Sequence, residues 1–172
     1  LQITAWATLI SVPIGLFAAI YLVEYGRGPL ARAITFFVDV MTGIPSIVAG
    51  LFAYALFALI FGEGVRMGFA GSVALSVLMI PVVVRSSEEM LKLVPNELRE
   101  ASYALGVPKW LTVVKVVLPT AAAGIITGIT LAIARVIGET APLLIVAGFT
   151  SSMNYNAFSE RMQSLPVFVY TQ

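Results

Sequence analysis

The chain contains no cysteine and no histidine among its 172 residues. Without cysteine it can form neither disulfides nor thiolate sites. Without histidine it lacks Ser-His and Cys-His catalytic pairs and histidine-based metal sites. It also has no Gly-Lys dipeptide, which a Walker A phosphate loop requires. We therefore expect no catalytic residue, no metal site and no ATP site in this chain.

Charged residues are also scarce. They make up 11% of the chain, whereas hydrophobic residues make up 59% and the mean hydropathy is +0.98. An average soluble domain carries about 25% charged residues. So few charges cannot cover a soluble surface, and the composition indicates an integral membrane protein. Because the chain begins and ends within apolar sequence, we expect it to be a fragment trimmed at both ends.

Four long apolar runs follow one another along the chain. Each reaches or approaches the ~20 residues that a helix needs to cross ~30 Å of hydrocarbon. We therefore expect an all-α, polytopic helical bundle with about four spans, forming a single transmembrane domain over residues 1–172. The runs cover residues 3–23, 34–61, 69–84 and 117–148.

The basic residues predict how the chain is oriented in the membrane. If the four runs alternate in direction, segments 24–33 and 86–116 share one side and hold six cations, whereas Arg66 and Arg161 lie on the other. An excess of lysine and arginine marks the cytoplasmic side. We therefore place 86–116 in the cytoplasm, and the N-terminus and residues 149–172 outside. The six cations are Arg27, Arg32, Lys92, Arg99, Lys109 and Lys115.

The second run is long for one crossing, and Pro45 interrupts it. Proline cannot donate a backbone N–H, and its ring would clash with the carbonyl of Met41. Two readings remain open. Either the helix breaks at 43–46, with 34–42 along the inner interface and 46–61 crossing, or the run is a simple kinked helix.

The fourth run is longer still. A straight helix of this length would extend ~48 Å against a ~30 Å core, so the run must tilt, kink or break. Pro142 would clash with the carbonyl of Gly138, four residues earlier. We expect the break between Gly138 and Pro142, with Glu139 inside it.

The longest polar stretch, 86–116, predicts a helical hairpin. Pro95 and Asn96 open a short helix, Gly106 ends it, and Pro108 begins a second helix at its first position. The hairpin is either a solvated loop that packs on the bilayer or a docking helix whose apolar side chains fill a groove on a soluble partner.

Two charges lie within the fourth run, Arg135 and Glu139. A charge in mid-membrane costs ~2.5–3.5 kcal/mol on insertion scales. Residues four apart share one helix face and can pair. The same face carries Gly124 and Gly128, small residues that let another helix approach closely. The pair is therefore expected to face protein or an aqueous path; a structural ion pair and an Arg135 that snorkels to the outer interface are the alternatives.

Arg85 ends the third apolar run. A basic residue at the cytoplasmic end of a span ordinarily snorkels to the interface and anchors the helix. Glu88 and Glu89 are its neighbours in sequence. The residues alone favour an anchoring role.

The cytoplasmic hairpin resembles a motif of ABC importer permeases, with the spacing E-A-A-x3-G-x9-I-x-L-P. The sequence departs from it at Ser102, which replaces the second alanine, and at Val116, which replaces isoleucine. The resemblance implies that the hairpin is the coupling helix that sits in a cleft of an ATPase subunit. The matching positions are Glu100, Ala101, Ser102, Gly106, Val116, Leu118 and Pro119.

The stretch "ARVIGETAPLL" (134–144) resembles the signature of phosphate ABC transporter permeases of the PstA type, within the binding-protein-dependent importer permeases. The resemblance covers essentially the whole chain and implies the second to the fifth of six spans. It also implies that Arg85, Arg135 and Glu139 lie on the phosphate path. The stretches "AAIYLVEYG" (18–26), "DVMTGIPSIVAGLF" (39–52) and "VPNELREASYALG" (94–106) agree with it.

The chemistry of those residues is compatible with phosphate. A guanidinium offers a fixed fork of donors that matches phosphate oxygens. Conduction needs release as well as entry. From its spacing, Glu139 is expected to moderate the attraction of Arg135 for phosphate.

The resemblance further implies the partners. They are a PstC-type permease subunit, two PstB-type ATPase subunits that hold ATP and magnesium, a phosphate-binding protein, and inorganic phosphate itself. The chain would be a multi-pass protein of a bacterial or archaeal inner membrane, within the lipid bilayer. It would bind no cofactor of its own and no nucleic acid.

Two alternative functions remain. One is an ABC permease for another oxyanion, such as sulfate or molybdate, against which the "GETAPLL" stretch argues. The other is an ATP-independent secondary transporter or channel. For the latter, Asp39 and Glu139 are the only candidate coupling carboxylates in the spans, and the hairpin would be unexplained.

Overall fold

The structure is a computed structural model of the chain and describes residues 2–62, 68–146 and 165–171. Within these ranges every regular element is a helix and no strand occurs. The predicted all-α fold is therefore confirmed for this part of the chain. Arg66, Arg161, most of the predicted outer tail and the end of the fourth apolar run lie outside the described residues.

Within the described ranges, three helical segments are long and apolar enough to cross a membrane, and a bent pair of helices could supply a fourth span. This agrees with the expected multi-pass architecture. The first segment is α1 (Gln2–Ile20) with the π-helix η1 (Tyr21–Tyr25), the second is α4 (Gly68–Lys92), and the third joins α6 (Lys109–Thr112), the π-helix η2 (Val113–Val117) and α7 (Leu118–Ile137).

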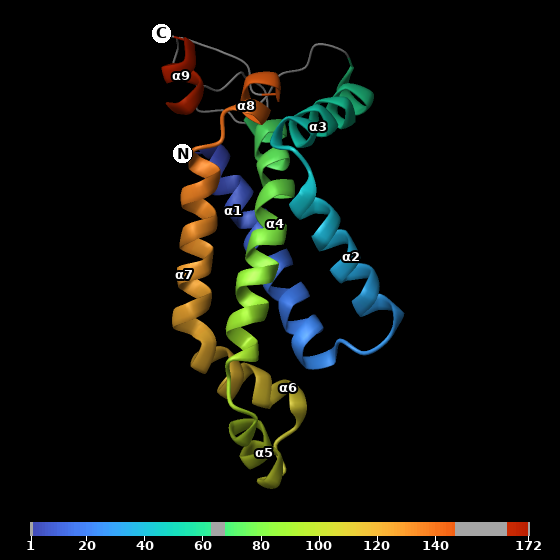
Figure 1. Cartoon of the computed structure of the whole chain (residues 1–172), viewed down its shortest axis with the longest axis vertical. Coiled ribbons are helices and arrows are strands. Elements are labelled where there is room, and N and C mark those ends of the chain that lie inside the picture. Colours follow the sequence, from blue (N-terminus) through green and yellow to red (C-terminus); the bar gives the residue numbers. More distant parts are fainter. Residues whose placement is uncertain (1, 63–67, 147–164, 172) are drawn as a thin grey trace.

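Helix α4 is the centre of the bundle (Figure 1). In its most apolar window 61% of the residues are buried, against 22% in the first segment and 28% in the third. Leu75, Met79 and Val83 of α4 are buried between α1 and α7. A Cβ atom at Gly15 of α1 would lie 2.7 Å from Cγ1 of Val83. The glycine therefore lets α1 pack directly on α4.

Large apolar side chains cover the outside of the bundle. Phe17 on α1 is 72% exposed, Leu59 on α3 is 87% exposed, and Leu131 on α7 is 65% exposed. A soluble monomer seldom shows so much apolar surface. The pattern fits a surface that contacts lipid or other membrane helices.

The second apolar run forms two helices, α2 (Pro29–Gly43) and α3 (Ser46–Phe61), which are bent by 109° relative to each other. Ile44 and Pro45, the two residues between them, have extended backbones, so the run is not a simple kinked helix.

The placement of the two halves is the reverse of the expected one. Helix α2 slopes along α4, whereas α3 lies across the end of the bundle beside α8 (Ala141–Val146; Figure 1). A physical reason is the contact between α3 and α8. A Cβ atom at Gly50 would lie 2.6 Å from Cα of Pro142, so the glycine seats α3 directly on α8.

The connections between the long helices lie at two opposite ends of the bundle, as the expected alternation of the spans predicts. The end of η1, the start of α2 and the hairpin of α5 (Asn96–Ala104) and α6 lie at one end (Figure 1). The N-terminus, α3, α8 and α9 (Leu165–Thr171) lie at the other. Segments 24–33 and 86–116, which hold most of the cations, therefore share one end of the molecule.

Candidate functional site

The hairpin turns at Gly106, whose φ is +77°. This left-handed conformation costs a residue with a side chain about 1–2 kcal/mol but is open to glycine. A Cβ atom there would meet nothing within 4 Å, so the requirement is one of backbone conformation and not of space. Pro108 precedes α6 as its capping residue, whereas the sequence predicted it as the first helical residue.

A hydrogen bond joins the two helices of the hairpin. The hydroxyls of Ser102 and Thr112 are 2.8 Å apart, and both residues are buried. Thr112 also donates to the carbonyl of Pro108 at 3.3 Å. Alanine, which the coupling motif has at position 102, could not form this bond. The departure from the motif thus has a structural consequence inside the hairpin.

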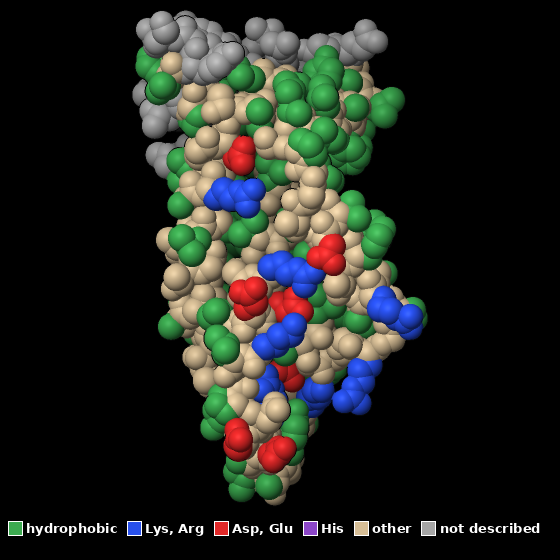
Figure 2. Space-filling model, viewed as in Figure 1, with side chains coloured by type: hydrophobic (Ala, Val, Ile, Leu, Met, Phe, Trp, Pro, Cys, Tyr) green, Lys and Arg blue, Asp and Glu red, His purple; other side chains and the backbone are tan. Residues whose placement is uncertain are grey.

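The outer face of the hairpin mixes acidic and apolar side chains, as Figure 2 shows at its tip. Glu100 and Ala101 are exposed, and Leu105 is 84% exposed. Leu118 is half-buried and Pro119 is exposed at the start of α7. Such a face, with large apolar residues on a short amphipathic helix, is suited to a groove on a partner.

An ion pair that the sequence did not suggest anchors the hairpin to the bundle. Arg99 of α5 binds Glu24 of η1, with Nη2 at 2.9 Å and Nε at 3.0 Å from Oε1 of the glutamate. The two side chains are only 12% and 4% exposed. A buried carboxylate requires such a partner, since an unpaired buried charge is costly.

Arg99 also binds the end of α4. Its Nη1 donates to the carbonyl of Val94 at 2.6 Å and to Oδ1 of Asn96 at 3.3 Å, and its Nη2 donates to the carbonyl of Leu91 at 3.0 Å. With the two bonds to Glu24, these occupy the guanidinium's five N–H donors. We call this contact of Arg99 with Glu24, Leu91 and Val94 the hairpin anchor.

Arg85 makes a second, more exposed ion-pair network. It binds Asp39 of α2, and its Nη1 lies 2.9 Å from Oε2 of Glu88. Lys92 binds the other oxygen of Glu88 at 2.7 Å. The side chain of Arg85 is 36% exposed and that of Asp39 is 58% exposed. Helix α4 continues past Arg85 to Lys92, so the helix extends beyond the end of the third apolar run.

A pocket of about 280 Å³ opens beside Arg85. Its walls include Thr42 of α2 and Pro81, Ser86 and Glu89 of α4. Glu89 therefore lines the pocket, while Glu88 binds the arginine. The hydroxyls of Thr42 and Ser86 donate to carbonyls of their own helices, so Arg85 supplies the donors that this pocket offers to a small oxyanion.

Arg135 and Glu139 do not form the expected ion pair within the part of the chain that the structure describes. Arg135 is exposed in the last turn of α7, and Glu139 is half-buried beyond its end. The helix ends at Ile137, so the i, i+4 geometry that would join the two side chains is lost. Both still lie at the same end of α7.

Gly124 and Gly128 lie where α7 crosses α4. A Cβ atom at Gly124 would lie 2.2 Å from Sδ of Met90, and one at Gly128 would lie 2.6 Å from Oγ of Ser86. The two glycines therefore let α7 approach the helix that carries Arg85.

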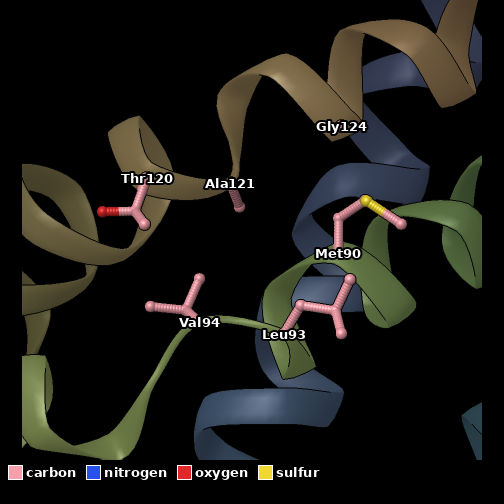
Figure 3. Close-up of a pocket in the computed structure, with 6 residues that line it drawn as sticks. All are labelled: Met90, Leu93, Val94, Thr120, Ala121 and Gly124. Carbon is pink, nitrogen blue, oxygen red and sulfur yellow. The ribbon is translucent and has the colours of Figure 1, made fainter.

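Figure 3 shows the pocket that these helices enclose below that crossing, with Met90 beside Gly124. Its volume is about 160 Å³, and none of the described residues that line it is charged. The hydroxyl of Thr120 donates to its own helix, to the carbonyl of Val116 at 2.6 Å. This apolar pocket offers no group that would hold an anion.

The chain leaves the helical path between α7 and α8. Gly138 follows the last residue of α7, and α8 begins at Ala141, with Pro142 as its second residue. Proline is tolerated at this position because the N–H groups in the first turn of a helix have no carbonyl partner within the helix. The N–H that proline lacks is therefore not needed there. Glu139 is one of the three residues of this break.

Among the described residues no group of three or more histidines, cysteines or carboxylates could hold a metal ion. The sequence predicted site roles for Arg85, Glu100, Ser102 and Gly106. It did not predict that Asp39 binds Arg85 or that Glu24 binds Arg99. Glu24 and Arg99 are 75 residues apart, so only the fold brings them together. The available signal was a carboxylate directly after the first apolar run.

A family model described as binding-protein-dependent transport system inner membrane component matches residues 11–171. The phosphate transport system permease protein PstA of Mycobacterium leprae (strain TN) is 55% identical over 166 residues, which is 96% of this chain and 54% of that protein. PstA of Yersinia pestis is 46% identical over 169 residues, 96% of this chain and 55% of that protein. This chain spans about half the length of these curated relatives.

A solved structure supports the fold. A chain of the MetNI methionine ABC transporter, crystallised in inward facing conformations, is similar with a TM-score of 0.71 and 26% identity. The match covers 80% of this chain and 66% of that one. Because the family model spans nearly the whole sequence, this chain belongs to the family of binding-protein-dependent transport system inner membrane components.

Proposed function

We propose that this chain is part of the permease subunit of an ATP-driven phosphate importer. The observation that carries the proposal is the 55% identity to a PstA protein over 96% of the chain. In this proposal the chain works with a PstC-type permease, PstB-type ATPases that bind ATP and magnesium, and a phosphate-binding protein. The assembly would sit in the inner membrane.

Arg85 is the proposed phosphate ligand of this chain. It is partly exposed, faces a pocket with Thr42 and Ser86, and is held by carboxylates instead of backbone groups. A phosphate that reaches the pocket competes with Asp39 for the guanidinium. Because the carboxylate can return, phosphate can leave again, as conduction requires. Asp39 thereby takes the moderating role that the spacing had suggested for Glu139.

Arg135 is the proposed second contact for phosphate. It is exposed near the end of α7 that lies away from the hairpin. Figure 2 shows charged side chains in a band along the face formed by α7, α4 and α2. In this proposal an anion enters beside Arg135 and reaches Arg85 afterwards.

The hairpin anchor is the proposed route by which ATP acts on the spans. Closure of the ATPases would move α5, and Arg99 would carry that motion to η1 through Glu24 and to α4 through Leu91. Its bond to the carbonyl of Val94 ties it to the connection that follows α4. These bonds use every donor of the guanidinium, so the hairpin and the two helix ends move as one body.

Uptake by the full-length protein, reconstituted with its partner subunits, tests the proposal. Labelled phosphate should enter proteoliposomes only with ATP, and excess unlabelled phosphate should compete. Sulfate and molybdate at the same concentration should not. Preferred uptake of sulfate or molybdate, or uptake that continues without ATP and ATPase subunits, would support one of the alternatives instead.

A further inference from the structure

A pocket of about 380 Å³ lies between η1, the end of α4 and the hairpin. Its walls carry four cations and one carboxylate, a formal excess of three positive charges. A concave site lined by charges of one sign concentrates ions of the opposite sign. The cations are Arg27, Lys92, Arg99 and Lys109, and the carboxylate is Glu24.

Two of these charges neutralise each other. Arg99 and Glu24 form the buried ion pair of the hairpin anchor, and all donors of Arg99 are occupied. Neither residue is therefore available to a ligand. They form a rigid wall of the pocket, and the positive charge of the pocket comes from the other three cations.

The other three cations have donors to spare. In the part of the chain that the structure describes, the exposed side chain of Arg27 has no ion-pair partner. Lys92 binds Glu88 and is 61% exposed. Lys109 donates to the carbonyl of Glu24, and its Nζ lies 4.9 Å from the ring centroid of Tyr25. A lysine carries three donors, so both lysines keep two.

Neutral donors complete the site. Tyr103 and Asn96 of α5 also line the pocket. Oδ1 of Asn96 accepts from Arg99, which leaves its amide N–H groups for another partner. Several donors from separate segments suit a compact anion with several acceptor oxygens.

We propose that this pocket binds a phosphate-bearing anion. The pocket lies at the end of the bundle that carries the basic connections, where a membrane presents anionic headgroups. A phosphodiester of a membrane lipid and free inorganic phosphate offer the same oxygens. The ligand would bridge Arg27 after η1, Lys92 on α4 and Lys109 on α6, which line this pocket from three separate segments.

The test uses the full-length protein, purified with whatever subunits accompany it. Native mass spectrometry measures how much phosphatidylglycerol it retains from nanodiscs that also contain phosphatidylcholine. Calorimetric titration measures its affinity for inorganic phosphate. A basic residue at an anionic surface contributes on the order of a fivefold change in affinity. Arg27→Gln should therefore weaken binding about that much, and Arg27→Gln with Lys92→Gln should weaken it further.

Two controls separate the site from general charge effects. Arg32→Gln removes an exposed cation at the same end of the molecule but outside the pocket and should change neither measurement. Arg27→Lys keeps the charge and should keep most of the binding. A variant-dependent loss of phosphatidylglycerol assigns the site to a lipid headgroup, and a variant-dependent loss of phosphate affinity assigns it to free phosphate.

Two results would overturn the proposal. One is that neither ligand binds in a way that depends on Arg27. The other is that Arg32→Gln weakens binding as much as Arg27→Gln. Phosphate held on the transport path beside Arg85 would not respond to Arg27→Gln, so this test and the test of transport can fail independently.

Discussion

Arg85 and Arg99 each bind carboxylates, yet their surroundings differ. Arg99 and Glu24 are 12% and 4% exposed, and backbone carbonyls occupy the remaining donors of the arginine. Arg85 and Asp39 are 36% and 58% exposed, and a pocket opens beside them. Breaking a buried pair leaves an uncompensated charge, whereas an exposed pair contributes little. The buried arginine is therefore suited to hold the structure, and the exposed one to exchange partners.

The largest expected effect follows from removing the carboxylate of the buried pair. Glu24→Ala leaves Arg99 charged and buried, which should lower the free energy of unfolding by about 3–5 kcal/mol. Denaturant titration of the purified protein measures it, with tryptic cleavage of the hairpin as a second readout. The matched control, Asp39→Ala, should cost less than about 1 kcal/mol because that pair is exposed. Equal losses in the two variants would remove the distinction between the pairs.

The next effect concerns transport. Arg85→Gln should reduce phosphate uptake at least about tenfold, because a hydrogen bond to a charged group contributes about 1.5–3 kcal/mol. The fold should survive, since Glu88 keeps Lys92 as a partner. Arg32→Gln is the control, because it removes an exposed arginine that does not line the pocket beside Arg85. Wild-type uptake by a normally assembled Arg85→Gln protein would argue against its role as a ligand.

A smaller effect tests the exchange of partners. Asp39→Asn removes the competitor of phosphate for Arg85, so phosphate should bind up to about fivefold more tightly, the equivalent of an exposed ion pair. Release should be slower, which single-turnover measurements can detect. Asp39→Glu keeps the charge and should behave more like the wild type. Weaker phosphate binding in Asp39→Asn would mean that the aspartate positions Arg85 instead of competing with its ligand.

The smallest effect concerns the interior of the hairpin. Ser102→Ala removes the hydrogen bond to Thr112 and should cost about 0.5–1.5 kcal/mol. Thr112 keeps its bond to the carbonyl of Pro108, so its hydroxyl is not left unpaired. Thr120→Ala, which removes an exposed hydroxyl bonded only to its own helix, is the control and should cost less. A loss in Ser102→Ala as large as that in Glu24→Ala would place the main support of the hairpin inside it.

Local features of the fold could be predicted from the sequence because local chemistry determines them. Asn96 and Gly106 bracket α5, which ends at Ala104, two residues before the glycine. The run around Pro45 divides into two helices, since proline cannot continue the hydrogen bonds of the first. Which half lies along α4 could not be predicted, because both halves are apolar and the packing of Gly50 on Pro142 decides it.

The partners of the charged residues could not be predicted from the sequence. Spacing suggested that Arg135 binds Glu139, but α7 ends between them and the pairing geometry is lost. Asp39 is 46 residues from Arg85, so only the packing of α2 on α4 brings them together. Periodicity describes residues on one helix, whereas these ion pairs join different helices.

The π-helix η2 has a consequence for how the hairpin and the bundle can change together. A π-turn amounts to one extra residue in an α-helix. If Val113–Val117 kept all five residues but wound as a regular α-helix, α7 would rotate by about 100° relative to the hairpin. Gly124 and Gly128 would then turn away from α4. The π-turn, by absorbing one extra residue, thus keeps the phase between the face of α7 that meets the bundle and the face of the hairpin that meets a partner.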